Sequence, residues 1–245
     1  MSKKFKETEE YQNVEKIISQ VFVNNLKVGV SSFREQWENE EIRIYFILEK
    51  TDFGGNVDFN EVTNHSWIFL QVLPRRALDE KIFVEVRVFH RENPEVKSLD
   101  WYKKKQDIAA MLPETHEEVL LLGGPNNNLI YEGLSSNFFC VKDGKIYLAP
   151  EGTMLPGTIM HIVIDCCNDL NIPLIREPPT LDDVKSWEGC FITSTSRLVL
   201  SVDRITFPEH PQFSEIQFDR CELIENLKAS VQKKLLSRSF DVLKE

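Results

Sequence analysis

The sequence predicts a mixed α+β protein, in which amphipathic helices accompany the strands of a sheet. Apolar residues recur at helical spacing over 7–26 and again over 221–236, with charged residues on the opposite face. Runs rich in Ile, Val, Tyr and Phe, such as 41–50 and 81–89, are typical of strands. With 245 residues, of which 42% are hydrophobic, the chain is long enough to bury a sizeable core.

The first part of the chain predicts a small α/β layer. Its expected elements are a helix over 7–26, strands over 41–50, 66–74 and 81–89, and a loop over 51–65. A connector follows near residues 91–97. We therefore expect a small N-terminal α/β domain over residues 1–93.

The second part predicts a larger α/β domain over residues 94–245. Its expected elements are helices over 99–112, 157–173, 180–187 and 221–236, strands over 117–124 and 128–150, and a strand, turn and strand over 189–205. Lys-Asp-Gly-Lys at 142–145 is a hairpin signal within the second of these strand regions. Thr180 is a candidate N-cap for the short helix.

The charge balance restricts the partners. The formal net charge is −10, whereas nucleic-acid binding needs a basic face, so we expect no nucleic-acid partner. An anionic small ligand would need a locally positive or dipolar site.

Cysteine usage and hydropathy indicate the compartment. The cysteines at 140, 166, 167, 190 and 221 form no CxxC pair, which indicates reduced core thiols in a cytosol-like environment. We find no apolar run of membrane-spanning length and no apolar signal stretch at the start. We expect a cytoplasmic protein without membrane contact, and an organellar presequence absent from this sequence is the open alternative.

Lys97 is the first candidate for chemistry, because it follows Asn-Pro-Glu-Val at the expected domain junction. The simpler interpretation is a surface lysine. The functional one is a Schiff-base lysine, which must be partly neutral near pH 7 and therefore needs burial or positive neighbours.

Glu132 is the second candidate, since it lies in an apolar strand region between Tyr131 and Phe138. An unpaired buried carboxylate is very costly, so Glu132 either points to solvent or has a partner. One such partner is a protonated ring nitrogen, because a pyridinium held by a carboxylate is the electron sink of pyridoxal-phosphate enzymes.

Two stretches are candidates for binding an anion. Pro156, Gly157 and Thr158 begin a helix, where backbone N–H groups and the helix dipole favour a phosphate. Hydroxyl residues follow a strand at 193–196, where either a phosphate-binding turn or an ordinary polar turn fits. The histidines lack metal-ligand spacing, so we expect no metal, and the lysines at 103–105 are interpreted as a solvated helix face.

In this order along the chain, these features resemble the fold-type IV pyridoxal-phosphate proteins, or class IV aminotransferases. That family includes D-amino-acid aminotransferase, branched-chain aminotransferase and aminodeoxychorismate lyase. The resemblance is specific over Tyr-Glu-Gly-Leu-Ser-Ser-Asn-Phe-Phe, Leu-Pro-Gly-Thr-Ile-Met-His-Ile-Val-Ile and Phe-Ile-Thr-Ser-Thr-Ser, and residues 1–90 match only in element order. It implies a small N-terminal domain, a C-terminal pseudo-barrel domain with helices, pyridoxal 5′-phosphate as cofactor and a homodimer.

The resemblance also implies a role for each matching residue. Lys97 would form the Schiff base and move the proton, and Glu132 would hold the pyridine nitrogen. The other expected contacts are Ser135, Ser136 and Asn137 along the ring, Leu155 on the cofactor face, Gly157, Thr158 and Ile159 as a phosphate cup, and Ser194 and Thr195 as a second phosphate turn.

Some positions depart from the family pattern. Thr158-Ile159-Met160 stands where the family usually has Ile-Thr-Arg, so the hydroxyl is displaced by one position. Trp101 and the basic residues after Lys97 are similar to a plant and algal class IV-like branch. Family members usually begin with further strands and a helix carrying a phosphate-binding arginine, and we expect that segment to be missing from this chain.

Three functions are compatible with these residues. The first is an aminotransferase acting on an amino acid and a keto acid. The second is an aminodeoxychorismate-lyase-like enzyme using the same lysine and cofactor. The third is a degenerate member of the fold that binds a ligand without turnover. The pairing of Lys97 with Glu132 favours the aminotransferase, because a non-catalytic fold has no physical need of that pair.

Overall fold

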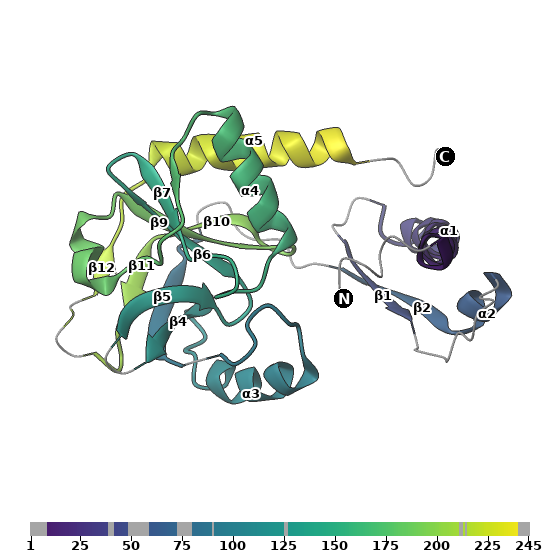
Figure 1. Ribbon diagram of the computed structural model, residues 1–245, viewed down its shortest axis with the longest axis horizontal. Helices are drawn as coiled ribbons and strands as arrows, with labels where there is room; N and C mark the ends of the chain where they lie inside the picture. Colours follow the sequence, from purple (N-terminus) through teal and green to yellow (C-terminus); the bar gives the residue numbers. More distant parts are fainter. Residues whose placement is uncertain are drawn as a thin grey trace. The chain divides into compact units, whose positions relative to one another are not determined.

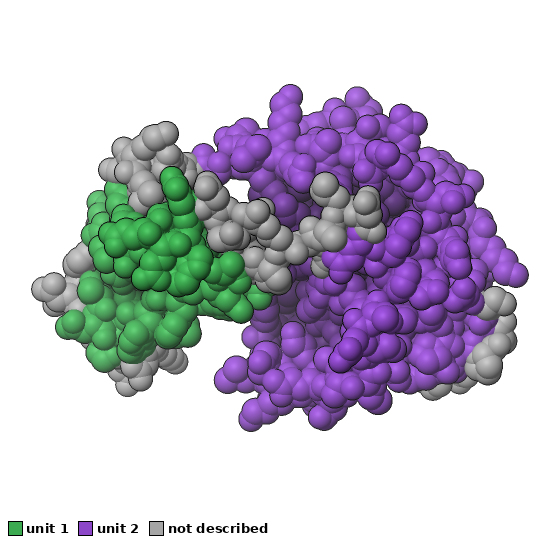
Figure 2. Space-filling view, turned by 180° about the vertical axis from the view of Figure 1, so that it is seen from behind, with its two compact units in different colours: residues 1–78, 240–245 green, residues 79–239 purple. Residues whose placement is uncertain are grey.

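The computed structural model describes residues 9–38, 42–48, 59–72, 80–89, 91–124, 127–210, 213 and 215–239 (Figure 1). The chain divides into two compact units, residues 1–78 with 240–245 and residues 79–239 (Figure 2). Both units mix helices with strands, as the sequence predicted.

The division falls earlier than the expected boundary between residues 93 and 94. The difference comes from strand β3 (Phe83–Val88), which pairs in parallel with β4 (Glu118–Gly124) and β11 (Arg204–Thr206). β3 therefore belongs to the sheet of the second unit. The sequence suggested the strand but not its partners, which lie far along the chain.

The first unit pairs two strands with helices. Its elements are α1 (Glu9–Arg34), β1 (Ile42–Leu48), α2 (Phe59–Asn64) and β2 (Ser66–Val72), with β1 and β2 antiparallel. The expected helix and strands are confirmed. Helix α2 lies in the expected loop, where the buried Val62 alone gave too little periodicity to indicate a helix.

The second unit is built on one large sheet. Its remaining elements are α3 (Leu99–Ala109), β5 (Asn127–Gly133), β6 (Asn137–Lys142), β7 (Lys145–Leu148), α4 (Thr158–Asp169), β8 (Leu174–Ile175), the 3₁₀ helix η2 (Leu181–Ser186), β9 (Gly189–Ser194), β10 (Leu198–Val202), β12 (Ile216–Gln217) and α5 (Glu222–Arg238). The strand order is β10-β9-β6-β5-β4-β3-β11-β12, and β7 pairs with both β6 and β8. Helices α4 and α5 pack together against β9 and β10, and α3 packs on β4 (Figure 1).

Strand β6 is buried on both faces, and its side chains alternate between two hydrophobic clusters. Phe138 packs with Trp187 in one cluster, whose ring centroids are 5.8 Å apart. Phe139 stacks on Phe191 in the other, beneath α4 and α5, with ring centroids 4.6 Å apart. This two-sided burial explains the apolar run in the sequence and anchors the start of β6, where the polar residues cluster.

Two local signals in the sequence are confirmed. Asp143 and Gly144 have φ values of 50° and 66°, as a tight hairpin turn between β6 and β7 requires. The Thr180 side chain accepts a hydrogen bond from the Asp182 N–H at 3.3 Å and caps η2.

The expected polar strand is interrupted. β5 ends at Gly133 and β6 begins at Asn137, so residues 134–136 form a tight corner between the two strands. The Gly133 N–H closes this corner by donating to the Ser136 carbonyl oxygen at 2.8 Å. Glu132 and Asn137 are thereby paired across the two strands.

The cysteines of the second unit are free thiols, as expected. Burial raises the pKa of Cys167 to about 12 and raises the pKa of Cys140 and of Cys190 as well. These thiols are therefore suited to packing and not to nucleophilic chemistry. Among the helices that the structure describes, none is long and apolar enough to span a bilayer.

Helix α5 provides a matched test of this packing. Leu227 is fully buried against α4 and the sheet, whereas Leu236 on the same helix is 75% exposed. We expect Leu227→Ala to lower the free energy of unfolding by about 2–5 kcal/mol. Leu236→Ala should change it by less than about 0.5 kcal/mol. Urea denaturation of both variants measures the difference, and equal effects would contradict the described position of α5.

Candidate active site

The second unit contains a pocket of about 450 Å³ where several strand and helix ends converge. All the site residues that the sequence analysis predicted line this one pocket. They are Lys97, Glu132, Ser135, Ser136, Asn137, Leu155, Gly157, Thr158, Ile159, Ser194 and Thr195. Their proximity is a property of the fold, and the role of each remains a prediction.

The sheet topology brings these residues together. β6 is antiparallel to both β5 and β9, so the end of β5, the start of β6 and the end of β9 lie together at one end of these strands. The loop before α3 and the first turn of α4 complete the wall. Residues from four separate parts of the sequence thus face one space.

A buried ion pair lies at the centre of the wall. Arg91 Nη1 donates to Glu132 Oε1 at 2.8 Å, and both side chains are at least nine-tenths buried. Arg91 Nη2 donates to the Val96 carbonyl oxygen at 2.8 Å, and the guanidinium lies 4.7 Å from the centroid of the Trp101 ring. Of the two possibilities for Glu132, the structure therefore shows a buried carboxylate with a partner.

Sequence reasoning missed Arg91. The requirement that a buried Glu132 must have a partner was evident, but nothing in the sequence indicated which cation would meet it.

Glu132 keeps capacity for another donor. Its second oxygen, Oε2, accepts the Leu155 N–H at 3.0 Å, so each carboxylate oxygen has one hydrogen bond within the protein. Burial raises the pKa of Glu132, and the Leu155 N–H and the Arg91 guanidinium oppose that rise. A further donor in the pocket, such as a ring N–H, would stabilise the ionised carboxylate.

Lys97 lies at the end of the loop that Arg91 holds. The next residue, Ser98, caps α3 by accepting the Trp101 N–H at 3.2 Å. Lys97 is exposed toward the pocket and has no hydrogen-bond or ion-pair partner among the described residues. The expected burial is absent, whereas a positive neighbour, Lys105, lines the same pocket.

The start of α4 is placed by Asn137. The Asn137 amide Nδ2 donates to the Leu155 carbonyl oxygen at 2.7 Å. A Cβ at Gly157 would lie 2.2 Å from Asn137 Oδ1, so only glycine allows this close approach. Gly157 is the N-cap of α4 and provides no side-chain cap, which leaves the first helical N–H groups available to an anion.

The two residues after Gly157 differ in their surroundings. Thr158 is exposed at the pocket, where its hydroxyl can reach a ligand. Ile159 packs its side chain into the cluster beneath α4, so it can contribute to the pocket mainly through its backbone.

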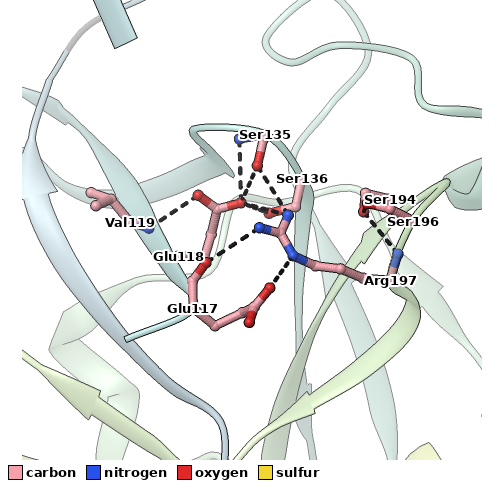
Figure 3. Close-up of polar contacts among 8 residues, drawn as sticks. All are labelled: Glu117, Glu118, Val119, Ser135, Ser136, Ser194, Ser196 and Arg197. Carbon is pink, nitrogen blue, oxygen red and sulfur yellow. Dashed lines mark hydrogen bonds and ion pairs between the residues drawn. The ribbon is translucent and has the colours of Figure 1, made fainter. Parts of the chain in front are cut away.

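A polar network lies below the corner between β5 and β6 (Figure 3). Glu118 Oε2 accepts the hydroxyls of Ser135 and Ser136 at 2.8 and 3.0 Å. It also accepts Arg197 Nη1 at 3.1 Å, and the Arg197 backbone N–H donates to Ser194 Oγ at 3.2 Å. The serine hydroxyls are thus committed to Glu118, and the network ties the 194–197 turn to the corner between β5 and β6.

Sequence reasoning missed Glu118 and Arg197. The only available signal was a pair of glutamates, Glu117 and Glu118, at the start of an otherwise apolar strand.

Thr193 is a further residue that the sequence analysis missed. It lines the pocket opposite Asn137 on the neighbouring strand and is 1% exposed. Its Oγ1 is buried and has no hydrogen-bond partner among the residues that the structure describes. A buried hydroxyl without a partner is unusual and marks a place where a ligand can bind.

The network around Glu118 predicts a difference between adjacent glutamates. The side chain of Glu118 is 3% exposed and that of Glu117 is 22% exposed, and both pair with Arg197. We expect Glu118→Gln to lower the free energy of unfolding by about 2–3 kcal/mol, because it removes the buried negative charge that accepts hydrogen bonds from Arg197, Ser135 and Ser136. Glu117→Gln should cost less than about 1 kcal/mol. Urea denaturation compares the two, and an equal or larger effect of Glu117→Gln would refute this assignment.

The hydroxyl of Thr193 predicts a stabilising substitution. Thr193→Val keeps the shape of the side chain and removes the unpartnered hydroxyl, so the unliganded protein should gain about 1 kcal/mol. Thr195→Val, at an exposed position two residues later, should change stability by less than about 0.5 kcal/mol. Thermal unfolding of the two variants without ligand measures this, and a destabilised Thr193→Val would show that the hydroxyl has a partner in solution.

Known proteins share parts of this sequence. A D-alanine aminotransferase from Staphylococcus aureus is 36% identical over 77 residues, which are 31% of this chain and 27% of that protein. A protein named "Probable branched-chain-amino-acid aminotransferase" from Rickettsia felis is 27% identical over 113 residues, 46% of this chain and 37% of that protein. The matched stretches thus span well under half the length of these relatives.

Solved structures share the fold. A branched-chain aminotransferase from Thermoproteus uzoniensis, solved with norvaline, superposes with a TM-score of 0.59 at 16% identity, covering 83% of this chain and 67% of that one. A fold IV transaminase from Curtobacterium pusillum gives a TM-score of 0.61 at 15% identity, covering 86% and 71%. The predicted fold type IV is therefore confirmed. The model of the family "Amino-transferase class IV" matches residues 9–205, which are most of the chain, and the chain belongs to this family.

Proposed function

We propose that the protein is a pyridoxal-phosphate-dependent aminotransferase that acts on an amino acid and a keto acid, with Lys97 as the amine that holds the cofactor. One observation carries the proposal. An unpaired lysine, a buried carboxylate and a helix start without a side-chain cap line the same pocket. Aminotransferase names among the relatives support it.

The chemistry of these residues fits pyridoxal phosphate. Glu132 is a buried carboxylate with a raised pKa and room for a ring N–H donor. The first turn of α4 and the unpartnered Thr193 hydroxyl offer donors for a phosphate at another part of the wall. The volume of about 450 Å³ is within the usual range for a small-molecule site.

When bound, pyridoxal phosphate supplies an aldehyde that condenses with amines and a ring that takes up the electron pair released at the substrate α-carbon. Lys97 Nζ would supply the amine that holds this aldehyde and would act as the base and acid for the proton of the substrate α-carbon. Glu132 would accept a hydrogen bond from the protonated ring nitrogen. Leu155 would cover the ring face and exclude water from it, and the Asn137 side chain holds the Leu155 carbonyl in place.

The substrate and assembly belong to the same proposal. Relatives named for D-alanine and for branched-chain amino acids indicate a small amino acid as donor and a keto acid as acceptor. A homodimer and a cytoplasmic location are proposed from the family resemblance and the composition. Among the residues that the structure describes, no group of His, Cys, Asp or Glu is arranged to hold a metal ion.

Chemical trapping tests the assignment of Lys97. We expect borohydride reduction of the protein with pyridoxal phosphate to fix one cofactor on Lys97, and peptide mapping by mass spectrometry identifies the lysine. Lys97→Ala should abolish the adduct, whereas Lys104→Ala, at an exposed position on α3, should retain it. An adduct on Lys105 instead of Lys97 would show that Lys97 is not the amine that holds the cofactor. The absence of an adduct on any lysine would reject the proposed cofactor chemistry.

Turnover separates the aminotransferase from the alternatives. We expect transfer of the amino group to proceed only when a keto-acid acceptor is present. Release of pyruvate from aminodeoxychorismate without an acceptor would instead support the lyase. A protein that traps the cofactor on Lys97 but gives neither reaction would support a non-catalytic member of the fold.

A further inference from the structure

The pocket contains one more cation than the proposed chemistry uses. The cationic residues that line it are Arg91, Lys97 and Lys105. Arg91 is paired with Glu132, and Lys97 is the proposed amine. Lys105 has no ion-pair or hydrogen-bond partner among the described residues.

The packing of α3 explains how Lys105 reaches the pocket. Trp101, four residues earlier, and Ile108, three residues later, are both buried against β4 in one cluster. Residues three and four apart lie on the same side of a helix, so Lys105 lies at the edge of this packed face. Its Nζ is 5.6 Å from the centroid of the Tyr102 ring, which also lines the pocket.

The other two lysines of the run have different surroundings. Lys103 and Lys104 are exposed, and Lys104 pairs with Glu92 at 3.9 Å. The interpretation of residues 103–105 as a solvated helix face therefore holds for these two and is wrong for Lys105. The helix geometry turns the last lysine of the run toward the site.

The electrostatic environment of Lys105 favours the binding of an anion next to it. Burial lowers the pKa of Lys105, and the nearby charges of Lys97, Arg197 and Arg91 lower it further. Glu118 acts in the opposite direction, but its carboxylate is committed to Arg197 and the two serines. Of the two carboxylates in the pocket lining, Glu132 is paired with Arg91 and Glu95 is exposed. An anionic ligand group would offset the cost of keeping Lys105 charged.

We propose that Lys105 binds the phosphate of the cofactor as the charged member of a site whose other donors are backbone N–H groups and hydroxyls. This inference rests on the proposed function. A phosphate carries nearly two negative charges, whereas a helix start supplies only about half a positive charge. In a chain with a net charge of −10, a nearby lysine supplies the missing compensation.

The test compares ligands that differ only in the phosphate. Pyridoxamine 5′-phosphate and pyridoxamine both lack the aldehyde, so their binding does not depend on a covalent bond to Lys97. We expect Lys105→Met to raise the Kd of pyridoxamine 5′-phosphate by at least about tenfold and to leave that of pyridoxamine within about twofold. Isothermal titration calorimetry on the full chain measures both constants.

Two further variants serve as controls. Lys104→Met removes the adjacent lysine that lies outside this pocket and should leave both constants unchanged. Lys105→Arg keeps the positive charge and should retain most of the preference for the phosphorylated ligand. It also distinguishes a lost contact from a protein that fails to fold.

The outcomes separate this inference from the proposed function. Equal losses for the two ligands, or no loss for either, would overturn the role of Lys105 in binding phosphate. The same holds if the unmodified protein binds both ligands equally. If the phosphate-specific loss is found but borohydride traps no cofactor on Lys97, the proposed function fails while the role of Lys105 stands.

Discussion

The buried ion pair between Arg91 and Glu132 is the constraint on which the rest of the site depends. Through its second guanidinium nitrogen, Arg91 holds the carbonyl of Val96 and thereby the loop that ends at Lys97. Through its second oxygen, Glu132 holds the N–H of Leu155 and thereby the approach to α4. One pair of charges thus connects the end of β5 with the loop before α3 and the start of α4.

This ion pair is costly for stability. Burying a carboxylate and a guanidinium carries a desolvation cost that their attraction only partly offsets, so a pair of apolar residues would serve a purely structural core at least as well. The pair is understandable if Glu132 must stay ionised where water is scarce. Arg91 then favours the ionised carboxylate before any ligand arrives, and a protonated ring nitrogen would complete its hydrogen bonding. A similar argument applies to Thr193, whose buried hydroxyl has no hydrogen-bond partner in the part of the chain that the structure describes.

The sequence could predict which residues share the pocket, but only through their order along the chain. A lysine at a junction, a carboxylate among aromatic residues and a Pro-Gly-Thr helix start are each ambiguous alone, and the resemblance to class IV aminotransferases named the set that lines one pocket. The residues that hold these groups in place, such as Arg91 and Arg197, have no recognisable local pattern in the sequence. Arg91 and Glu132 are 41 residues apart, and Glu118 and Arg197 are 79 apart, so only the folded sheet brings them together.

The same limit explains the misinterpretation of Lys105 and the difference between the expected domain boundary and the division into two units. The side of a helix that a lysine occupies depends on which neighbours are buried, and the burial of Trp101 and Ile108 against β4 could not be read from the run itself. Likewise, the parallel pairing of β3 with β4 and β11 assigns residues 83–88 to the second unit. Local patterns gave the elements, and the long-range pairing decided their partners.

The most direct test of this account is a crystal structure of the protein with pyridoxal phosphate. The account predicts the ring nitrogen within hydrogen-bond distance of Glu132, continuous density between the cofactor and Lys97 Nζ, and the phosphate at the first turn of α4. A cofactor bound with its phosphate toward Arg91 and Glu132, or in the neighbouring cavity lined by Phe89 and Tyr131, would contradict it.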